Sequence, residues 1–306
     1  MQQTTPAVLP RLGLILALCG WLLFSLHDAA IKWLVADYSA WQILFVRSAV
    51  VLAICLAIGR RRLALQAATS PVRRALLLRS VIFMAAWLCY FTAARYLQLA
   101  ELVTLYFGSP LMVAALAAPM LGEKVPPTRW AFILIGFAGV VVACWPAALN
   151  TWWPVGLVLL AALLLAYSMI LIRQIARAEP TLVQMLVANT TFLILCGAAM
   201  PWAWVTPDLI GLALMLLVGV IGAAGQFTII ESIRHVPASV VAPLEFTALV
   251  WSFLLGYAIW GDVPDWPVFV GAALILASGT MIVTSEWDRS GTLRARIAPP
   301  RDGPAL

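Results

Sequence analysis

The chain has 306 residues, of which 64% are hydrophobic and 10% charged, and its formal net charge is +6. Soluble domains average about 25% charged residues, so this composition excludes a soluble globular protein. Apolar runs of about 20 residues recur along the sequence, and a helix of that length crosses a bilayer core of about 30 Å. Because the runs are continuously apolar rather than alternating, they predict helices and exclude a membrane β-barrel.

Ten such runs are predicted to be membrane-spanning helices, and they account for most of the chain. In chain order they cover residues 12–34, 39–58, 76–97, 101–121, 129–147, 154–174, 181–203, 209–233, 238–259 and 266–284. The first run is longer than a typical signal core and lacks a small-x-small cleavage site, so we interpret it as a span. The polar tail, residues 286–306, is rich in Pro and Arg, which predicts disorder.

Metal and nucleotide chemistry have no support in the sequence. The five cysteines lie within or at the ends of apolar runs without metal-ligand spacing, and we interpret them as small packing residues. The glycines of GVIGAAG (219–225) lie inside an apolar run with no preceding strand, which is typical of close helix packing rather than a phosphate loop. We therefore predict no cofactor, no metal and no ATP-driven step.

The basic residues are distributed unevenly between the two sides of the predicted bundle. If the N-terminus (residues 1–11) is cytoplasmic, 16 of the 19 Lys and Arg residues fall at the inner ends of the spans, Arg79 among them. Lys32 and Arg95 lie at outer ends, and Arg47 lies inside a run. This asymmetry predicts that both termini are cytoplasmic. We interpret the basic clusters as topology signals that meet anionic lipid, and expect no nucleic-acid partner.

The second half of the chain repeats the first. WQILFVRS (41–48) resembles VQMLVANT (183–190), which pairs Arg47 with Asn189, and MLGEKVPPTRW (120–130) resembles IWGDVPDWPVF (259–269). The offsets of about 140 residues predict two five-helix repeats, 12–148 and 149–285. Because five is odd, the second repeat enters the membrane in the opposite sense. Inverted repeats are typical of transporters whose substrate site lies near the midplane.

Longer motifs resemble a known family. SPLMVAALAAPMLGEKV (109–125) and APLEFTALVWSFLLGYAIWGDVPD (242–265) resemble paired motifs of the drug/metabolite transporter superfamily, EamA type. GFAGVVV (136–142) and GAALILASGTMIV (271–283) resemble the glycine-bearing helices that close each half there. The resemblance implies an all-α carrier of ten transmembrane helices, built as two inverted five-helix repeats around a central cavity. Members export small metabolites, and one branch, which this chain resembles less specifically, exports aromatic amino acids.

Arg47 is the most unusual residue, because an arginine inside a span normally faces a bundle interior or a wet cavity. We expect it to be balanced by Asp28 or Glu245. Two interpretations stay open: Arg47 meets the carboxylate of an amino-acid-like substrate, or it forms a permanent ion pair that locks two helices together. The variants Arg47→Ala and Arg47→Lys would separate them.

The other polar residues of the first span suggest local pairing. Asp28 and Lys32 are spaced i, i+4 and can partly neutralise each other, while Lys32 is close enough to the outer interface to snorkel. His27 points about 100° away from Asp28 around the helix, so we do not expect the two to form a dyad. Either could carry a coupling proton.

Glu245 follows Pro243, and Pro110 occupies the corresponding part of the first half. Paired interruptions in matching helices predict a site near the midplane. Aromatic residues inside spans supply a possible cavity wall, with Phe83, Trp87 and Tyr90 on one helix face. The candidate substrate-binding residues are Arg47, Asp28, His27, Trp87, Tyr90, Tyr106, Tyr167, Glu245 and Trp251.

These features predict a secondary transporter of the bacterial inner membrane that exports amino acids, with aromatic ones as candidates. A carrier for a vitamin, nucleoside or nucleotide sugar is the alternative. An intramembrane enzyme is disfavoured because neither an HExxH nor a G-x-S-x-G motif occurs, and a channel because no repeated polar ring suggests a pore. The expected partners are a small-molecule substrate and the lipid bilayer. We expect a monomer, with a dimer as the alternative.

Overall fold

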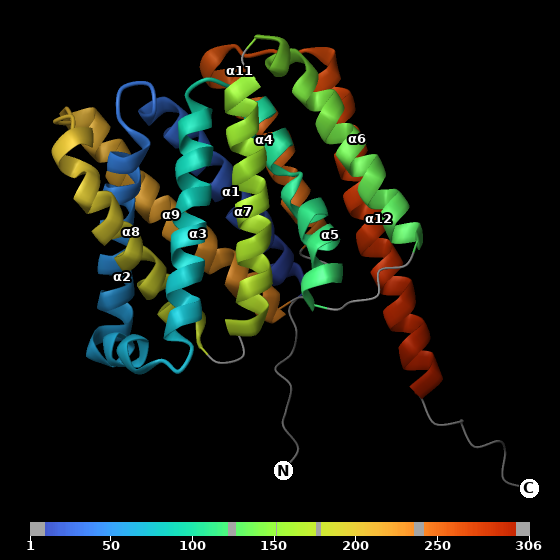
Figure 1. Ribbon diagram of the computed structural model, residues 1–306, viewed down its shortest axis with the longest axis horizontal. Helices are drawn as coiled ribbons and strands as arrows, with labels where there is room; N and C mark the ends of the chain where they lie inside the picture. Colours follow the sequence, from blue (N-terminus) through green and yellow to red (C-terminus); the bar gives the residue numbers. More distant parts are fainter. Residues whose placement is uncertain (1–9, 122–126, 151, 176–178, 236–241, 298–306) are drawn as a thin grey trace, which may run out of the picture.

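The computed structural model describes residues 10–121, 127–150, 152–175, 179–235 and 242–297, and all regular structure in these ranges is helical. The elements are α1 (Pro10–Leu34), α2 (Ala40–Thr69), α3 (Arg73–Ala94), α4 (Leu99–Tyr106), α5 (Ser109–Leu121), α6 (Pro127–Asn150), α7 (Trp152–Ile175), α8 (Thr181–Ala203), α9 (Leu209–His235), the short 3₁₀ helix η1 (Ala242–Phe246), α11 (Thr247–Trp260) and α12 (Trp266–Ile297). In Figure 1 these helices form a single bundle, in which α2 ends, α3 begins and α12 ends toward the same side.

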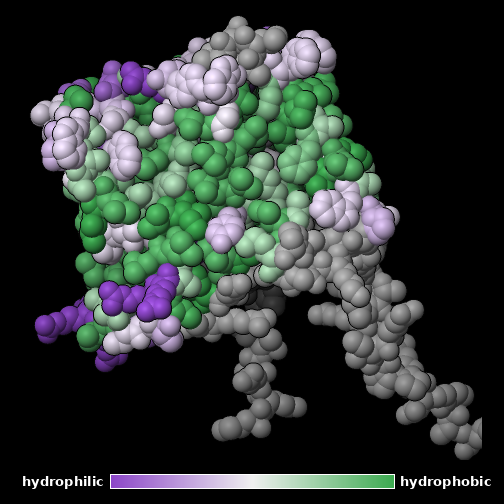
Figure 2. Space-filling view, viewed as in Figure 1, coloured by the Kyte–Doolittle hydropathy of each residue, from purple (hydrophilic) through white to green (hydrophobic). Residues whose placement is uncertain are grey.

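The outside of the bundle suits a lipid environment. Among the described residues, six helices are long and apolar enough to cross a membrane, and four shorter apolar helices accompany them. Large apolar side chains such as Leu134 (65%), Val141 (64%) and Ile194 (64%) are mostly exposed. Figure 2 shows the resulting hydrophobic belt, with hydrophilic groups above and below it. The chain is therefore a multi-pass membrane protein.

Helices from the first and second parts of the chain interleave. α1 packs against α9 and α3 against α7, while α2 packs against α8 and α6 against α12. Each of these contacts joins a helix that precedes residue 151 with one that follows it. The two parts therefore share a common interior instead of forming separate bundles.

Two of the ten predicted spans are interrupted rather than continuous. The run 101–121 divides into α4 and α5, with a turn at Phe107 and Gly108. Pro110 is the second residue of α5, where its missing N–H is tolerated although it would break a helix interior. In the run 238–259, the described part opens with η1 and becomes α-helical only at Thr247. Interruptions are therefore present in both matching runs, as expected. In each run the helix type or the helix itself changes, rather than one α-helix bending smoothly.

The ends of two helices also differ from expectation. α12 continues to Ile297, so the first twelve residues of the tail predicted to be disordered are helical. Residues 298–306 lie outside the described part. The extension is physically reasonable because adding residues to an existing helix costs much less than nucleating one. α2 runs past residue 58 to Thr69, with a kink at Arg60 (φ 50°, ψ −154°).

α6 and α12 approach each other closely through two glycines of the family-like motifs. A Cβ on Gly139 would lie 2.9 Å from the carbonyl oxygen of Gly271 and 2.8 Å from Cβ of Leu274. Nearby, the Ser278 hydroxyl donates to the carbonyl of Phe132 at 2.6 Å. The absence of side chains at this crossing lets the two backbones meet, as in other small-residue contacts between membrane helices.

The variant Gly139→Val is therefore expected to destabilise the protein by about 1–3 kcal/mol, which is typical of overpacking a closed interface. Thermal unfolding of the purified protein in detergent measures the effect. Gly156→Val is the matched control, because a Cβ there meets nothing within 4 Å. Equal melting temperatures for the two variants would contradict a tight α6–α12 crossing.

Candidate functional site

A cavity of about 500 Å³ lies inside the bundle. Its described lining residues come from α1, α2, α3, α4, α5, α7, α8, α9, η1 and α11, and none of them belongs to α6 or α12. Both helix interruptions face it, through Phe107 and Pro110 on one side and Glu245 on the other. The cavity extends to Thr181, the exposed first residue of α8, and to Arg79 in the second turn of α3. It therefore reaches toward the end of the bundle where α3 and α8 begin.

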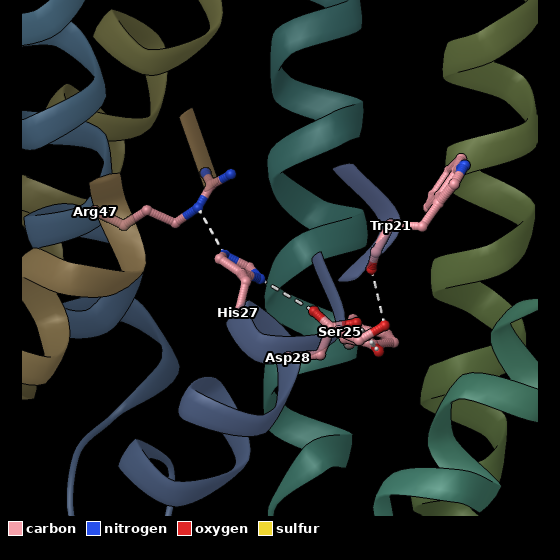
Figure 3. Close-up of polar contacts among 6 residues, drawn as sticks. Trp21, Ser25, His27, Asp28 and Arg47 are labelled. Carbon is pink, nitrogen blue, oxygen red and sulfur yellow. Dashed lines mark hydrogen bonds and ion pairs between the residues drawn. The ribbon is translucent and has the colours of Figure 1, made fainter. Parts of the chain in front are cut away.

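A chain of four polar side chains joins α1, α2 and α3 beside this cavity. The Arg47 Nε–H donates to Nε2 of His27 at 3.2 Å, and Nδ1 of His27 lies 3.1 Å from Oδ1 of Asp28. The Tyr90 hydroxyl donates to the other Asp28 oxygen, Oδ2, at 3.0 Å. Figure 3 shows the central part of this chain, with His27 between Arg47 and Asp28. The network links three helices through one buried histidine.

The donors and acceptors in this chain determine the state of His27. An arginine Nε–H can only donate, so Nε2 of His27 must offer its lone pair. Nδ1 therefore carries the proton and donates a hydrogen bond to Asp28, and the imidazole is neutral in this arrangement. His27 is fully buried (0% exposed) and does not line the cavity. It is a connecting residue rather than a cavity residue.

One expectation about this region is wrong, and the expected balance of Arg47 by Asp28 is indirect. His27 and Asp28 do form a hydrogen-bonded pair, although consecutive residues point about 100° apart around a helix. Arg47 lies within 4 Å of no carboxylate oxygen in the described part of the chain. His27 stands between Arg47 and Asp28 and transmits their attraction through two hydrogen bonds.

Glu245 lines the cavity as expected. Its carboxyl has no ion-pair or hydrogen-bond partner among the described residues. It is partly buried on η1, at the interruption that precedes α11. A carboxyl in this position is available for a cationic group of a bound solute.

The predicted aromatic wall exists and belongs mainly to α3. Trp87 and Tyr90 both line the cavity, together with Phe83. Tyr106 from α4 packs on Tyr90 with ring centroids 4.7 Å apart. The Arg47 guanidinium lies over the Trp87 ring, with Cζ 5.0 Å from the centroid, so the wall also holds the arginine by a cation–π contact.

Besides His27, two predicted candidates do not line the cavity. Tyr167 packs against a separate apolar cluster that includes Val51 and Leu171. The cavity reaches Ala248 on α11 but not Trp251, almost one turn further along. Both residues are inside spans, but hydropathy alone does not specify which side of a helix faces the interior.

Several cavity residues were not among the candidates. Arg79 had been assigned to an inner loop with its neighbours Arg73 and Arg74, yet it is 7% exposed and lines the cavity. Asn189 also lines the cavity. Its alignment with Arg47 in the sequence repeat is a signal from which this position could be predicted. The other described polar or aromatic lining residues outside the candidates are Trp21, Phe24, Ser25, Phe83, Phe107, Ser109, Thr181, Gln184, Phe192 and Gln226.

The opposite end of the bundle is held by Lys32 and Asp262. The Lys32 ammonium lies 3.4 Å from Oδ2 of Asp262 and donates to the carbonyl of Leu97 at 2.7 Å. It also lies over the Trp260 ring, 5.2 Å from the centroid. Lys32 therefore does not neutralise Asp28, because the Asp262 carboxylate in the connection between α11 and α12 is its ion-pair partner.

The α1–α2 and α8–α9 connections are bonded at this same end. The Gln42 side-chain amide exchanges two hydrogen bonds with the backbone of Val205, at 2.7 and 2.9 Å. The Tyr38 hydroxyl donates to Asp208 at 2.9 Å. The hydrogen bond from the Gly211 N–H, supported by Tyr38, lowers the pKa of the Asp208 carboxyl below its ordinary value, so the carboxylate is ionised at neutral pH.

Comparisons with known proteins agree with a transport cavity. The family model described as the EamA-like transporter family matches residues 11–145 and again residues 152–284. The pseudopaline exporter CntI of Pseudomonas aeruginosa is 29% identical over 281 residues, which cover 89% of this chain and 94% of the relative. The S-adenosylmethionine uptake transporter of Rickettsia bellii is 26% identical over 276 residues, covering 87% and 93% of the two chains.

A riboflavin transporter of Rhizobium johnstonii is 31% identical over 192 residues, 62% of this chain and 63% of the relative. One solved crystal structure matches with a TM-score of 0.63 and 19% identity over 91% of this chain and 98% of that one, which is a likeness of fold. The expectation of a transporter rather than an enzyme is confirmed. The chain, with its lipid-facing exterior and polar interior, belongs to the EamA-like transporter family.

Proposed function

We propose that this chain is a secondary carrier that moves zwitterionic, amino-acid-type metabolites across the bacterial inner membrane by alternating access. The composition of the cavity wall carries the proposal: two guanidiniums (Arg47, Arg79), two carboxyls (Asp28, Glu245) and an aromatic surface. A solute with both a carboxylate and an ammonium group can find a complementary partner for each, and an apolar side chain can contact the rings. The aromatic surface favours substrates with a ring.

The carrier mechanism requires two states of one pseudo-symmetric body, and we propose inverted repeats over residues 12–148 and 149–285. The helix contacts support this, because exchanging the two halves turns the α1–α9 contact into the α7–α3 contact and maps the α2–α8 and α6–α12 contacts onto themselves. The double match of the family model supports it too. Arg47 and its repeat partner Asn189 both line the cavity.

The cavity then corresponds to an inward-facing state. In this proposal both termini are cytoplasmic, and the end where α3 and α8 begin is the inner end, because Arg60, Arg61 and Arg62 lie there. In this proposal, the ion pair of Lys32 with Asp262 and the hydrogen bonds of Gln42 with Val205 close the outer end of the bundle. Export then begins with loading of the substrate from the cytoplasm.

A second candidate is a carrier for a larger metabolite. The relatives named for riboflavin and for S-adenosylmethionine favour it, and the latter is named for uptake rather than export. Eight aromatic residues among those described as lining the cavity would also suit a flat heterocycle. They are Trp21, Phe24, Phe83, Trp87, Tyr90, Tyr106, Phe107 and Phe192.

Flux through purified protein in liposomes tests the proposal. The panel contains labelled aromatic and aliphatic amino acids, riboflavin and S-adenosylmethionine, each with and without a proton gradient. We expect saturable flux of at least one amino acid that other amino acids inhibit. Flux restricted to riboflavin or S-adenosylmethionine would replace the amino-acid assignment with the second candidate, and chemical change of the solute would contradict a carrier.

A further inference from the structure

We propose that Arg79, rather than Arg47, is the guanidinium that binds the substrate carboxylate. This inference rests on the proposed transport of zwitterionic metabolites and assigns one end of the substrate to a specific residue. It reverses the expectation from sequence, in which Arg79 was a topology signal and Arg47 was the candidate for substrate contact.

The surroundings of Arg79 leave its donors unused. The side chain is 7% exposed and lines the cavity, and its Nε atom is buried without a hydrogen-bond partner. Within the described part of the chain, no carboxylate oxygen lies within ion-pair distance of it. The Arg79 guanidinium lies over the Phe83 ring, with Cζ of Arg79 5.3 Å from the ring centroid.

The unpaired Nε–H of this guanidinium is costly, because it is buried and has lost water without gaining an acceptor. Such exceptions are rare in folded proteins and are retained where a ligand completes them. A carboxylate matches the planar fork of arginine with two parallel hydrogen bonds. The missing partner of Arg79 is therefore an anionic acceptor that enters the cavity.

Arg47 is already engaged. Its Nε–H is bonded to His27, and its planar face lies on Trp87. Through His27 it is coupled to Asp28, which supplies the compensating charge. A substrate carboxylate at Arg47 would compete with the hydrogen bond to His27. At Arg79 it would supply the acceptor that Nε lacks.

Other lining groups near the aromatic wall indicate the same ligand chemistry. The indole N–H groups of Trp21 and Trp87 are buried without acceptors. With Arg79 they are unpaired donors that oxygen acceptors of a ligand would satisfy, beside one buried lining acceptor without a donor, Oδ1 of Asn189. Phe83, which carries the cation–π contact of Arg79, also packs on Phe192 at 5.9 Å. The anion-binding end of the cavity is therefore bordered by rings that can hold an aromatic side chain.

The test compares L-phenylalanine with L-phenylalaninamide, which keeps the amine and the ring but replaces the carboxylate with a neutral amide. Both are measured as flux in liposomes containing the full-length protein, for the unmodified chain and for Arg79→Gln and Arg79→Lys. Arg74→Gln is the matched control, since Arg74 is exposed one turn earlier on the same helix. Size-exclusion profile and melting temperature confirm that each variant is folded.

The unmodified protein is expected to prefer L-phenylalanine, and Arg79→Gln to reduce that preference by about 10- to 100-fold, the usual range for a hydrogen bond to a charged group. Arg79→Lys should retain part of the preference, and this variant decides the question if Arg79→Gln does not fold. Arg74→Gln should change nothing. Equal loss of both fluxes, or an unchanged preference, in Arg79→Gln would overturn the role of Arg79 while leaving the carrier intact. An unmodified protein that moves neither solute would overturn this inference, and the amino-acid panel described above would then decide the proposed transport separately.

Discussion

Replacing Arg47 with alanine is expected to destabilise the whole bundle, with loss of transport as a secondary effect. The substitution leaves Nε2 of His27 without a donor and removes the positive charge that compensates Asp28 across α1 and α2. Removing one partner of a buried charge pair costs about 3–5 kcal/mol, because the remaining charge is left uncompensated. The measurement is the melting temperature of the purified protein, together with the yield of monodisperse material.

Two further variants make this expectation specific. Arg47→Lys keeps the charge and a donor but loses the planar contact with Trp87, so it should recover part of the stability. Arg95→Ala removes an exposed arginine just beyond α3 and should leave the melting temperature unchanged. If Arg47→Ala unfolds at the same temperature as the unmodified protein and loses only transport, Arg47 contacts substrate and the interpretation as a helix lock is wrong.

Glu245→Gln is expected to act in the opposite way, reducing binding while leaving stability unchanged or slightly higher. Glu245 lines the cavity without a cation partner in the described part of the chain, so removing its charge breaks no internal bond. It does remove the proposed counter-charge for a substrate ammonium group. The apparent affinity for a zwitterionic amino acid should fall by about 10- to 100-fold, as expected for loss of a charged hydrogen bond.

Competition assays in liposomes measure this change, because they compare inhibition by the zwitterion with inhibition by its deaminated acid. The deaminated acid should be affected much less than the zwitterion. Asp37→Asn, at an exposed position after α1, is the control for loss of a carboxylate outside the cavity. A large drop in melting temperature for Glu245→Gln would indicate an internal partner and contradict a free carboxyl.

The sequence predicted the spans well because hydropathy is a property of continuous segments. It also placed Arg47, Asp28, Trp87, Tyr90, Tyr106 and Glu245 at one cavity, since polar and aromatic groups inside spans tend to face the interior. Tyr167 and Trp251 do not line the cavity, because position within a span says little about which helix face is turned inward.

The errors concern side-chain positions and contacts that the sequence alone does not specify. Lys32 had a partner available four residues away, and only the fold shows that Asp262 lies closer. Arg79 resembled a loop arginine because it closely follows Arg73 and Arg74, although α3 begins early enough to carry it into the interior. The His27–Asp28 bond depended on side-chain rotamers, which a helical wheel does not include.

The neutral histidine at the centre of the polar chain has a thermodynamic consequence. The lone pair on Nε2 of His27 accepts the Arg47 Nε–H, and the same lone pair is the site that a proton would occupy. Protonation and the Arg47 contact are therefore mutually exclusive, and a proton arriving there would set two cations against each other across α1 and α2. Separation of Arg47 from His27 and proton uptake at Nε2 of His27 are thus thermodynamically linked.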